Sequence, residues 1–125
     1  MSRLSTPPTP AATLLAELLA QPDVELGQGD MAGERSVRVK GREFLHVHGR
    51  SLLHIHLTRA EKEAALASGE AEPHPYAPRS GMVELNLISE DQLPAARRLA
   101  RQAMVRVAAL ADRLARPHRG AASSA

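Results

Sequence analysis

Histidines alternate with apolar residues along two neighbouring segments of this chain, and this alternation constrains the fold more than any other feature. His46 and His48 lie in the first segment, and His54 and His56 lie in the second. Successive side chains of a β-strand point to opposite faces of a sheet, so each pair of histidines shares one face of its strand. The two segments, joined by a short loop that contains glycine, therefore predict a β-hairpin.

The length of that loop decides whether the four histidines meet. A two-residue turn at Gly49-Arg50 pairs residues whose numbers sum to 99, and then Leu45 and Val47 share a face with the histidines of the second strand. A three-residue loop that includes Ser51 raises the sum to 100, which gives one apolar face and one face with all four histidines. Because a slip of one residue exchanges the faces, the apolar pattern should select the register. We therefore predict the three-residue loop, with the histidines on the face away from the core.

Capping signals and apolar periodicity predict the other elements. We expect a first helix after Thr9-Pro10 that Pro22 stops, a short extended piece at 24–26 and a loop at 27–30. Strands near 36–40, 43–48 and 52–57 follow, and then a helix over 59–68 that opens with a Thr58–Glu61 capping box and ends at Gly69. The chain continues with a loop without regular structure at 72–81, a strand at 82–88, and a last helix that follows a Ser89–Gln92 capping box and runs to about Ala115. Near Gly41-Arg42 the alternation favours an odd-numbered loop or a β-bulge. Phe44 and Met82 fall on the histidine face in this pattern.

The helices and the sheet each have one apolar side to bury. The stripe of the last helix consists of Leu93, Ala96, Leu99, Ala103, Met104, Val107, Leu110 and Leu114. Packing these sides together predicts an α+β fold of two layers: an antiparallel sheet of about four strands with helices on one face, in the order α-β-β-β-α-β-α. A chain of 125 residues is one domain by its length. We expect residues 9–116 to form that domain, between a disordered leader (1–8) and a disordered tail (117–125).

The composition excludes several classes of protein and site. The chain has no cysteine, so it forms no disulfide and no thiolate metal site. No apolar run reaches the roughly 20 residues of a membrane span, and the first ten residues lack the apolar region of a secretory signal. With a net charge of +2, one Phe, one Tyr and no Trp to stack on bases, the chain is not expected to bind nucleic acid. We expect a cytoplasmic protein without a membrane segment.

Several short motifs resemble small bacterial proteins of the luciferase-domain family. The motifs are Gly41-x-Glu43, His46-x-His48-Gly49, Arg59, Ala71-Glu72-Pro73-His74 and Ser80-Gly81-x-Val83, and the resemblance covers roughly residues 20–108. The order of elements is also similar to that of YjbR-like proteins, which implies the α+β fold of that group. The family name implies no established reaction, because a flavin-dependent luciferase resembles a TIM barrel of at least about 200 residues and this chain is shorter.

The chain departs from the family pattern at three places. It has His54 where members usually have Asp, His56-Leu57 where they usually have Pro-Phe, and Met82 where they usually have Trp. A site of the family that used the Asp would therefore be lost or altered in this chain.

Two interpretations of the alternating histidines remain open. Imidazole suits Zn, Ni, Cu or Fe, and two histidine pairs on adjacent strands could surround one ion. In that interpretation the ligands are His46, His48, His54, His56 and Glu84, the last from the strand at 82–88. In the other interpretation the histidines are polar residues on the solvent side of the sheet, or they pack under a partner subunit. The sequence identifies no side chain that would hydrogen-bond to the second ring nitrogen of these histidines, a partner that metal-bound histidines usually have.

The proline-rich loop contains a second candidate site. His74 lies there beside Glu72 and near Ser80, a combination that suggests acid–base or nucleophilic chemistry. The alternative is that these side chains cap the backbone of their own loop. The chain has no G-x-S-x-G motif, which a serine hydrolase of that kind would have.

From these observations we expect a small ligand- or partner-binding module that uses the histidine-rich sheet face and the loop at 72–81. The candidate ligand-binding residues are Arg42, Glu43, His46, His48, His74 and Ser80. An uncovered, half-apolar sheet face also favours a homodimer. The alternative is a histidine-based metal-binding protein or a metal-dependent enzyme. The sequence specifies no substrate and no cofactor.

Overall fold

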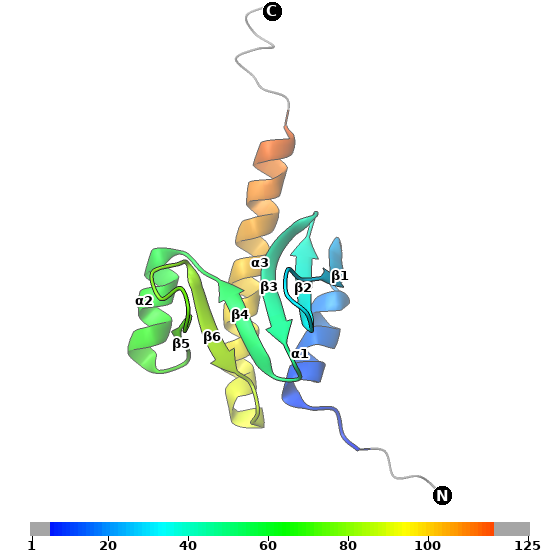
Figure 1. The fold of residues 1–125 in the computed structure, drawn as a ribbon. Helices are drawn as coiled ribbons and strands as arrows, with labels where there is room; N and C mark the ends of the chain where they lie inside the picture. Colours follow the sequence, from blue (N-terminus) through cyan, green and yellow to red (C-terminus); the bar gives the residue numbers. More distant parts are fainter. Residues whose placement is uncertain (1–5, 117–125) are drawn as a thin grey trace, which may run out of the picture.

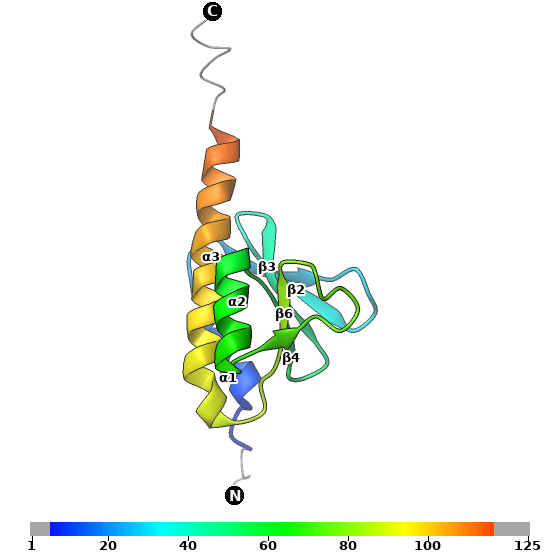
Figure 2. The ribbon, with the colours of Figure 1, turned by 90° about the vertical axis from the view of Figure 1, so that its left-hand side faces the viewer.

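The structure, a computed structural model, describes residues 6–116, which form one antiparallel sheet with helices packed on one of its faces. Figure 1 looks onto the sheet with α3 behind it, and Figure 2 shows the helical layer beside the sheet. The α+β class, the antiparallel sheet and the single helical layer agree with the prediction. The predicted disordered leader (1–8) and tail (117–125) lie outside the described residues, apart from residues 6–8.

Six strands and three α-helices make up the part of the chain that the structure describes, so the sheet is larger than the predicted one. The strands are β1 (Val24–Gln28), β2 (Glu34–Val39), β3 (Arg42–His48), β4 (Leu52–His56), β5 (Glu72–Pro73) and β6 (Met82–Asn86). The helices are α1 (Pro10–Leu19), α2 (Arg59–Ser68) and α3 (Leu93–Ala115), and a 3-10 turn, η1 (Glu90–Gln92), precedes α3. Across the sheet the order is β1-β2-β3-β4-β6-β5.

The helices α1 and α2 begin at the capping signals that predict them, and the predicted Ser89–Gln92 box caps η1, just before α3. Thr9 Oγ1 accepts a hydrogen bond from the backbone N–H of Ala12 at the start of α1. Thr58 and Glu61 form a reciprocal capping box at the start of α2, which ends at Gly69 with a φ of 77°. A second reciprocal box leads through η1 into α3. These side chains satisfy backbone N–H groups that a helix start otherwise leaves without partners.

The core lies between the sheet and the helices and consists mainly of aliphatic side chains. Its buried members on the strands include Val37, Leu45, Val47, Leu53, Ile55, Val83 and Leu85, and those on α3 include Ala96, Leu99, Ala100 and Ala103. The predicted stripe of α3 is confirmed as far as Val107. It is wrong at Leu110 and Leu114, which are 36% and 58% exposed, because α3 runs past the end of the sheet (Figure 1).

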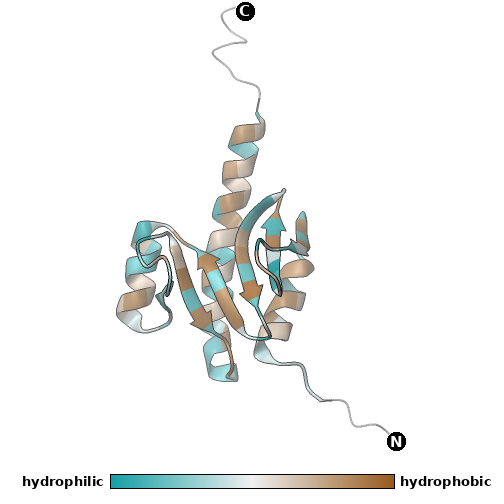
Figure 3. Cartoon of the chain, in the orientation of Figure 1, coloured by the Kyte–Doolittle hydropathy of each residue, from teal (hydrophilic) through white to brown (hydrophobic). Residues whose placement is uncertain are grey.

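The β3–β4 hairpin has the predicted register. His46 pairs with His54 and Leu45 pairs with Ile55, so the paired numbers sum to 100 and the loop is the tripeptide 49–51. Leu45 and Ile55 are in the core, and the histidines lie on the other face. Polar and apolar residues alternate along the strands in Figure 3. The burial of the apolar set therefore accounts for the choice of loop.

The β2–β3 hairpin has a two-residue turn rather than an odd-numbered loop. Lys40 and Gly41 occupy the turn with φ values of 53° and 82°, and Val39 pairs with Arg42. Positive φ at both central residues is the mark of a type I′ turn, whose twist matches that of a hairpin. The predicted alternative, a β-bulge, is found inside β3.

Phe44 is the extra residue of this bulge, and the prediction that it stands on the histidine face is wrong. Val37 pairs with Leu45 but Arg38 pairs with Glu43, so Phe44 has no partner on β2. Phe44 and Leu45 are consecutive in the chain, yet they are 0% and 1% exposed in the same core. The bulge thus turns Phe44 into the core and brings Glu43 to the face of the histidines.

The two strands that the prediction did not count lie at the edges of the sheet. β1 includes residues 27–28, which were expected in a loop, and β5 pairs with β6 in a segment expected to have no regular structure. Proline lacks a backbone N–H, and an edge strand has one unpaired side, so Pro73 fits at this position. Both edge strands lead into long loops, at 29–33 and 74–81.

Candidate functional site

The sheet face opposite the helices carries the histidines, and two loops flank it. The loop at 29–33 joins β1 to β2, and the loop at 74–81 joins β5 to β6. Figure 2 shows both loops on the side of the sheet away from the helices. His46 and His54 lie between them and are only 6% and 4% exposed. The expectation of an uncovered sheet face is therefore wrong at its centre, because loops cover it where helices cover the other face.

A hydrogen-bonded chain of four side chains crosses the middle of this face. His46 Nδ1 lies 3.1 Å from Glu43 Oε2, and His46 Nε2 lies 2.9 Å from His54 Nδ1. His54 Nε2 lies 2.9 Å from Glu84 Oε2. Ionised carboxylates only accept hydrogen bonds, so each ring donates an N–H to its carboxylate. The hydrogen bond between the two rings needs one further proton, so the imidazole pair carries a positive charge when both carboxylates are ionised.

Glu43 accepts hydrogen bonds from three side chains. His46 Nδ1 and His56 Nε2 lie 3.1 and 2.7 Å from Oε2, and the Ser36 hydroxyl donates to Oε1 over 2.7 Å. Burial alone would raise the pKa of Glu43, but these hydrogen bonds outweigh it and hold the pKa well below its ordinary value. Glu43 therefore remains ionised at neutral pH although it is partly buried.

The pKa values of the two central histidines move in opposite directions. Burial lowers the pKa of His46, but the hydrogen bond and charge of Glu43, together with nearby carboxylates, raise it overall. Burial also lowers the pKa of His54; the hydrogen bond to Glu84 opposes this only in part, and the charges of neighbouring histidines lower the pKa further. His46 is therefore the more basic of the two rings.

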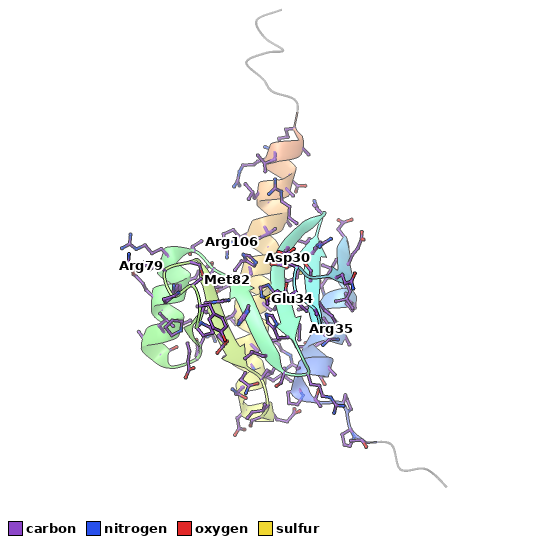
Figure 4. The ribbon with its side chains drawn as sticks, in the orientation of Figure 1. Asp30, Glu34, Arg35, Arg79, Met82 and Arg106 are labelled. Carbon is purple, nitrogen blue, oxygen red and sulfur yellow. The ribbon has the colours of Figure 1, made fainter. Side chains whose placement is uncertain are left out.

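Glu34 contributes a buried carboxylate from β2. It is 7% exposed, and its Oε2 lies 3.1 Å from His48 Nε2 and 3.7 Å from His46 Nε2. Its Oε1 accepts a hydrogen bond from the backbone N–H of Asp30 over 3.0 Å. Gly29 makes room for this arrangement, because a Cβ there would lie 2.3 Å from Oε1. One oxygen of Glu34 is thus anchored, and the other faces the histidines; Figure 4 labels Glu34 and Asp30 in front of the sheet.

Two groups of side chains hold nitrogen and oxygen atoms close enough to share one metal ion. In the first group, ring nitrogens of His46, His48 and His54 lie within 4.8 Å of one another. In the second group, the same holds for one ligand atom each of Glu43, His46 and His56. The buried carboxylate of Glu34 lies beside the first group. The two groups overlap at His46, one of the two central members of the hydrogen-bonded chain.

The cluster forms the floor of a cavity of about 720 Å³ between the two loops. The lining consists of Asp30, Met31, Glu34, Glu43, His46, His48, Leu52, His54, His56, His74, Pro75, Tyr76, Met82 and Glu84. Within residues 6–116, no Lys or Arg lines this cavity, whereas four carboxylates do. The volume lies within the range of small-molecule sites, about 300–1,000 Å³. The floor therefore attracts cations, and apolar side chains from the loops and strands surround it.

The structure brings most of the predicted site residues to this cavity. Those that line it are Glu43, His46, His48, His54, His56, His74 and Glu84. Arg42 instead lies exposed at the start of β3. Ser80 lies in a separate hollow beside α2, with Lys62 and Arg79, and its hydroxyl donates a hydrogen bond to the carbonyl of Ala77. Arg79 is labelled in Figure 4, beside α2.

His74 caps its own loop, as one of the two interpretations predicts, and it also lines the cavity. Its Nδ1 accepts hydrogen bonds from the backbone N–H groups of Tyr76 and Ala77, over 3.2 and 3.1 Å. Its ring packs beside that of His54, with the ring centroids 4.3 Å apart. Because Nδ1 is an acceptor, the neutral ring carries its proton on Nε2.

Sequence reasoning missed Glu34, Asp30, Met31 and Tyr76 as lining residues. Glu34 could have been found, because continuing the strand alternation back from Ser36 places it on the histidine face. The predicted strand began at Ser36 and so left it out. The other three lie in loops, whose paths no periodic pattern reports.

No helix among residues 6–116 is long and apolar enough to cross a membrane. In comparisons with known proteins, the family model described as Luciferase domain matches residues 41–103, half of the 125-residue chain. This segment runs from the β2–β3 turn into α3 and holds every histidine of the cavity, but it does not include Glu34. No curated protein and no solved structure gives a significant match. The similarity to YjbR-like proteins stays a prediction.

Proposed function

The chain belongs to the luciferase-domain family, and we propose that it binds one divalent transition-metal ion on the histidine face of its sheet. The proposed ligands are His46, His48, His54 and Glu34. The family match specifies no ligand and no reaction, so the proposal rests on the site. The observation that carries it is the convergence of three ring nitrogens and one anchored carboxylate oxygen at the floor of the cavity.

The spacing of the donor atoms supports this set. In a tetrahedral site with metal–nitrogen distances of about 2.0–2.1 Å, neighbouring ligand atoms lie about 3.3 Å apart. His46 Nε2 lies 2.9 Å from His54 Nδ1 and 3.7 Å from Glu34 Oε2, and His48 Nε2 lies 3.1 Å from the same oxygen. These distances bracket the ideal one. Three imidazoles and a carboxylate suit ions such as Zn²⁺, Ni²⁺ and Co²⁺.

Two carboxylates would hydrogen-bond to the metal-bound histidines, the feature that the sequence did not identify. Glu43 accepts from Nδ1 of His46, and Glu84 accepts from Nε2 of His54. Each contact involves the nitrogen that is not proposed to bind metal. Carboxylates in this position orient metal-bound imidazoles and raise their basicity. Both remaining nitrogens, His46 Nε2 and His54 Nδ1, therefore face each other with fixed orientation.

In this proposal the ion takes the place of the proton between the two rings. The nitrogens of His46 and His54 that now share a proton are the ones that would each offer a lone pair to the ion. Metal binding should therefore release protons, as it does at other histidine sites. The excess of carboxylates over basic residues around the cavity supports a cation at this position.

The second group, Glu43, His46 and His56, is less suited to hold an ion. Both oxygens of Glu43 already accept hydrogen bonds, one from Ser36 and the other from both histidines. The His56 side chain is 37% exposed, whereas those of His46 and His54 are 8% and 5% exposed. An ion there would have fewer protein donors and more contact with solvent.

The experiment is a titration of metal-free protein with Zn²⁺ and Ni²⁺, followed by calorimetry and by thermal unfolding. We expect one ion per chain, and ion at 100 times its Kd should add about 2.7 kcal/mol to the free energy of unfolding. His48→Ala should weaken binding by at least about 100-fold, since losing a ligand costs more than losing a residue that only hydrogen-bonds to a ligand.

His56→Ala is the matched control, because it removes a partly exposed histidine of the second group and leaves the proposed ligands in place. It should change the affinity by only a few-fold. No uptake by the wild-type chain at metal well above micromolar would exclude the proposal. Loss of binding in His56→Ala, with binding kept in His48→Ala, would move the ion to the second group.

A further inference from the structure

We infer that the metal ion in this cavity takes, as an additional ligand, an uncharged organic molecule with an apolar body and one nitrogen or oxygen donor. The inference rests on the proposed metal site and concerns the space above it. The proposed protein ligands come from the sheet floor and from β2, at the start of that strand. Ions such as Ni²⁺ and Co²⁺ accept more than four ligands. Any position that the protein leaves open therefore faces the cavity.

The rim of the cavity is apolar, and its parts come from opposite edges of the sheet. Met31 lies in the loop after β1, and Tyr76 lies in the loop after β5. They are 65% and 92% exposed, although both side chains are large. Leu52 from β4 and Met82 from β6 continue the apolar lining toward the floor; Figure 4 labels Met82 on this face. A molecule held between the loops would bury this surface, which favours an apolar body.

The charges of the cavity disfavour an anionic ligand. Asp30, Glu34, Glu43 and Glu84 line it. A divalent ion offsets two of these charges, and no Lys or Arg within the described lining offsets the rest. Phosphates and carboxylates would therefore meet repulsion at the floor. A neutral donor such as an imidazole, amine or carbonyl meets none, and the Nε2–H of His74 is on the wall as a hydrogen-bond donor.

The test uses the full chain loaded with Co²⁺, whose visible absorption changes when a ligand joins the ion. The probes are imidazole, 4-phenylimidazole and benzoate. All three offer a metal donor, but only 4-phenylimidazole combines an uncharged donor with an apolar body. We expect it to bind about 10- to 50-fold more tightly than imidazole, since burial of a phenyl ring is favourable, and we expect benzoate to leave the spectrum unchanged at the same concentration.

Variants at the rim locate the effect. Tyr76→Ala and Met31→Ala should each reduce the preference for 4-phenylimidazole by at least about threefold and leave the affinity for imidazole unchanged. Ile88→Ala is the control, because Ile88 is 67% exposed, much like Met31, but does not line the cavity. It should leave both affinities unchanged.

The outcomes separate this inference from the metal site itself. If the chain takes up no cobalt, both the proposed metal site and the inference about its additional ligand are wrong. A chain that takes up cobalt but binds 4-phenylimidazole no better than imidazole, or binds benzoate as well, overturns only the inference about the ligand. A preference that survives both rim substitutions also overturns it, because the apolar contact would then lie elsewhere.

Discussion

Side chains on the two faces of the sheet are buried by different kinds of interaction. Toward the helices, Leu53 and Ile55 are buried by apolar contact, which has no direction and needs only volume. Toward the loops, His54 is buried almost as deeply, but it depends on hydrogen bonds with His46 and Glu84 in one arrangement. The first face accounts for the stability of the fold. The second is costly to bury without its partners, so its side chains remain buried only while they keep that arrangement.

Two adjacent leucines of β4, one on each face of the sheet, test this comparison with the largest expected change in the free energy of unfolding. Leu53 is 1% exposed in the core, whereas Leu52 is half-buried and lines the cavity. Leu53→Ala should lower the free energy of unfolding by about 2–5 kcal/mol, because it leaves a cavity in the core. Leu52→Ala should cost less than about 1.5 kcal/mol. Chemical denaturation of both variants checks this, and equal losses would mean that both faces are packed alike.

A substitution of Glu84 tests whether the hydrogen bonds on the loop side of the sheet support metal binding. Glu84→Gln keeps the size of the side chain but removes the charge that orients His54, so we expect metal affinity to fall by about 10- to 100-fold. Glu72→Gln is the control, because Glu72 pairs with Glu84 across the strands but does not line the cavity. Calorimetric titration with Zn²⁺ distinguishes the two. Equal affinities in both variants would show that the carboxylate does not support the site.

Loss of a helix cap should lower the stability of the fold without changing metal binding, because the capping residue Thr58 does not line the cavity. Thr58→Ala removes the acceptor for the backbone N–H of Glu61, and we expect a loss of about 1 kcal/mol in the free energy of unfolding. Thr58→Ser should retain nearly all of it. Metal affinity should remain that of the wild type in both. A change of affinity in Thr58→Ala would show that the helical layer and the cavity are coupled.

Glu61 gives the smallest effect, and its sign depends on pH. Burial would raise its pKa, but hydrogen bonds from the Thr58 backbone and from Arg106 lower it below the ordinary value of 4.5. A lowered pKa stabilises the folded state above the unfolded pKa, and this contribution is lost as the pH falls through the folded one. Glu61→Gln should thus cost under about 1 kcal/mol at pH 7 and nothing in strong acid.

Glu63→Gln is the matched control for that measurement, because Glu63 is on the same helix but is largely exposed and pairs with the exposed Arg59. Its stability should follow that of the wild type at every pH. Urea denaturation over a pH series measures both variants. A deficit of Glu61→Gln that persisted in strong acid would mean that the effect is not electrostatic.

The sequence predicts the hairpin and the helices because each depends on a local or periodic signal. Leu45, Val47, Leu53 and Ile55 form one apolar set only if the loop has three residues, and the structure has that loop. The capping residues fix the helix starts within the same few residues that they cap. The α+β class follows from the number of apolar faces that must be covered.

The rest of the site depends on contacts that no local pattern contains. Glu43 reaches the histidines only through the bulge at Phe44, and Glu34 does so only with the space beside Gly29. The loops that carry Met31 and Tyr76 follow edge strands, of which the sequence predicts only an extended piece at 24–26. The homodimer, the cytoplasmic location and the binding of a partner stay predictions.

The bulge at Phe44 has a consequence for how related sites should be sought. On a regular strand, residues three apart point to opposite faces of the sheet. A carboxylate and an imidazole at that spacing could therefore not contact each other. Here the extra residue brings Glu43 and His46 within hydrogen-bonding distance. A search that demands even spacing along strands would discard this pair, whereas one that allows a single inserted apolar residue between them would retain it.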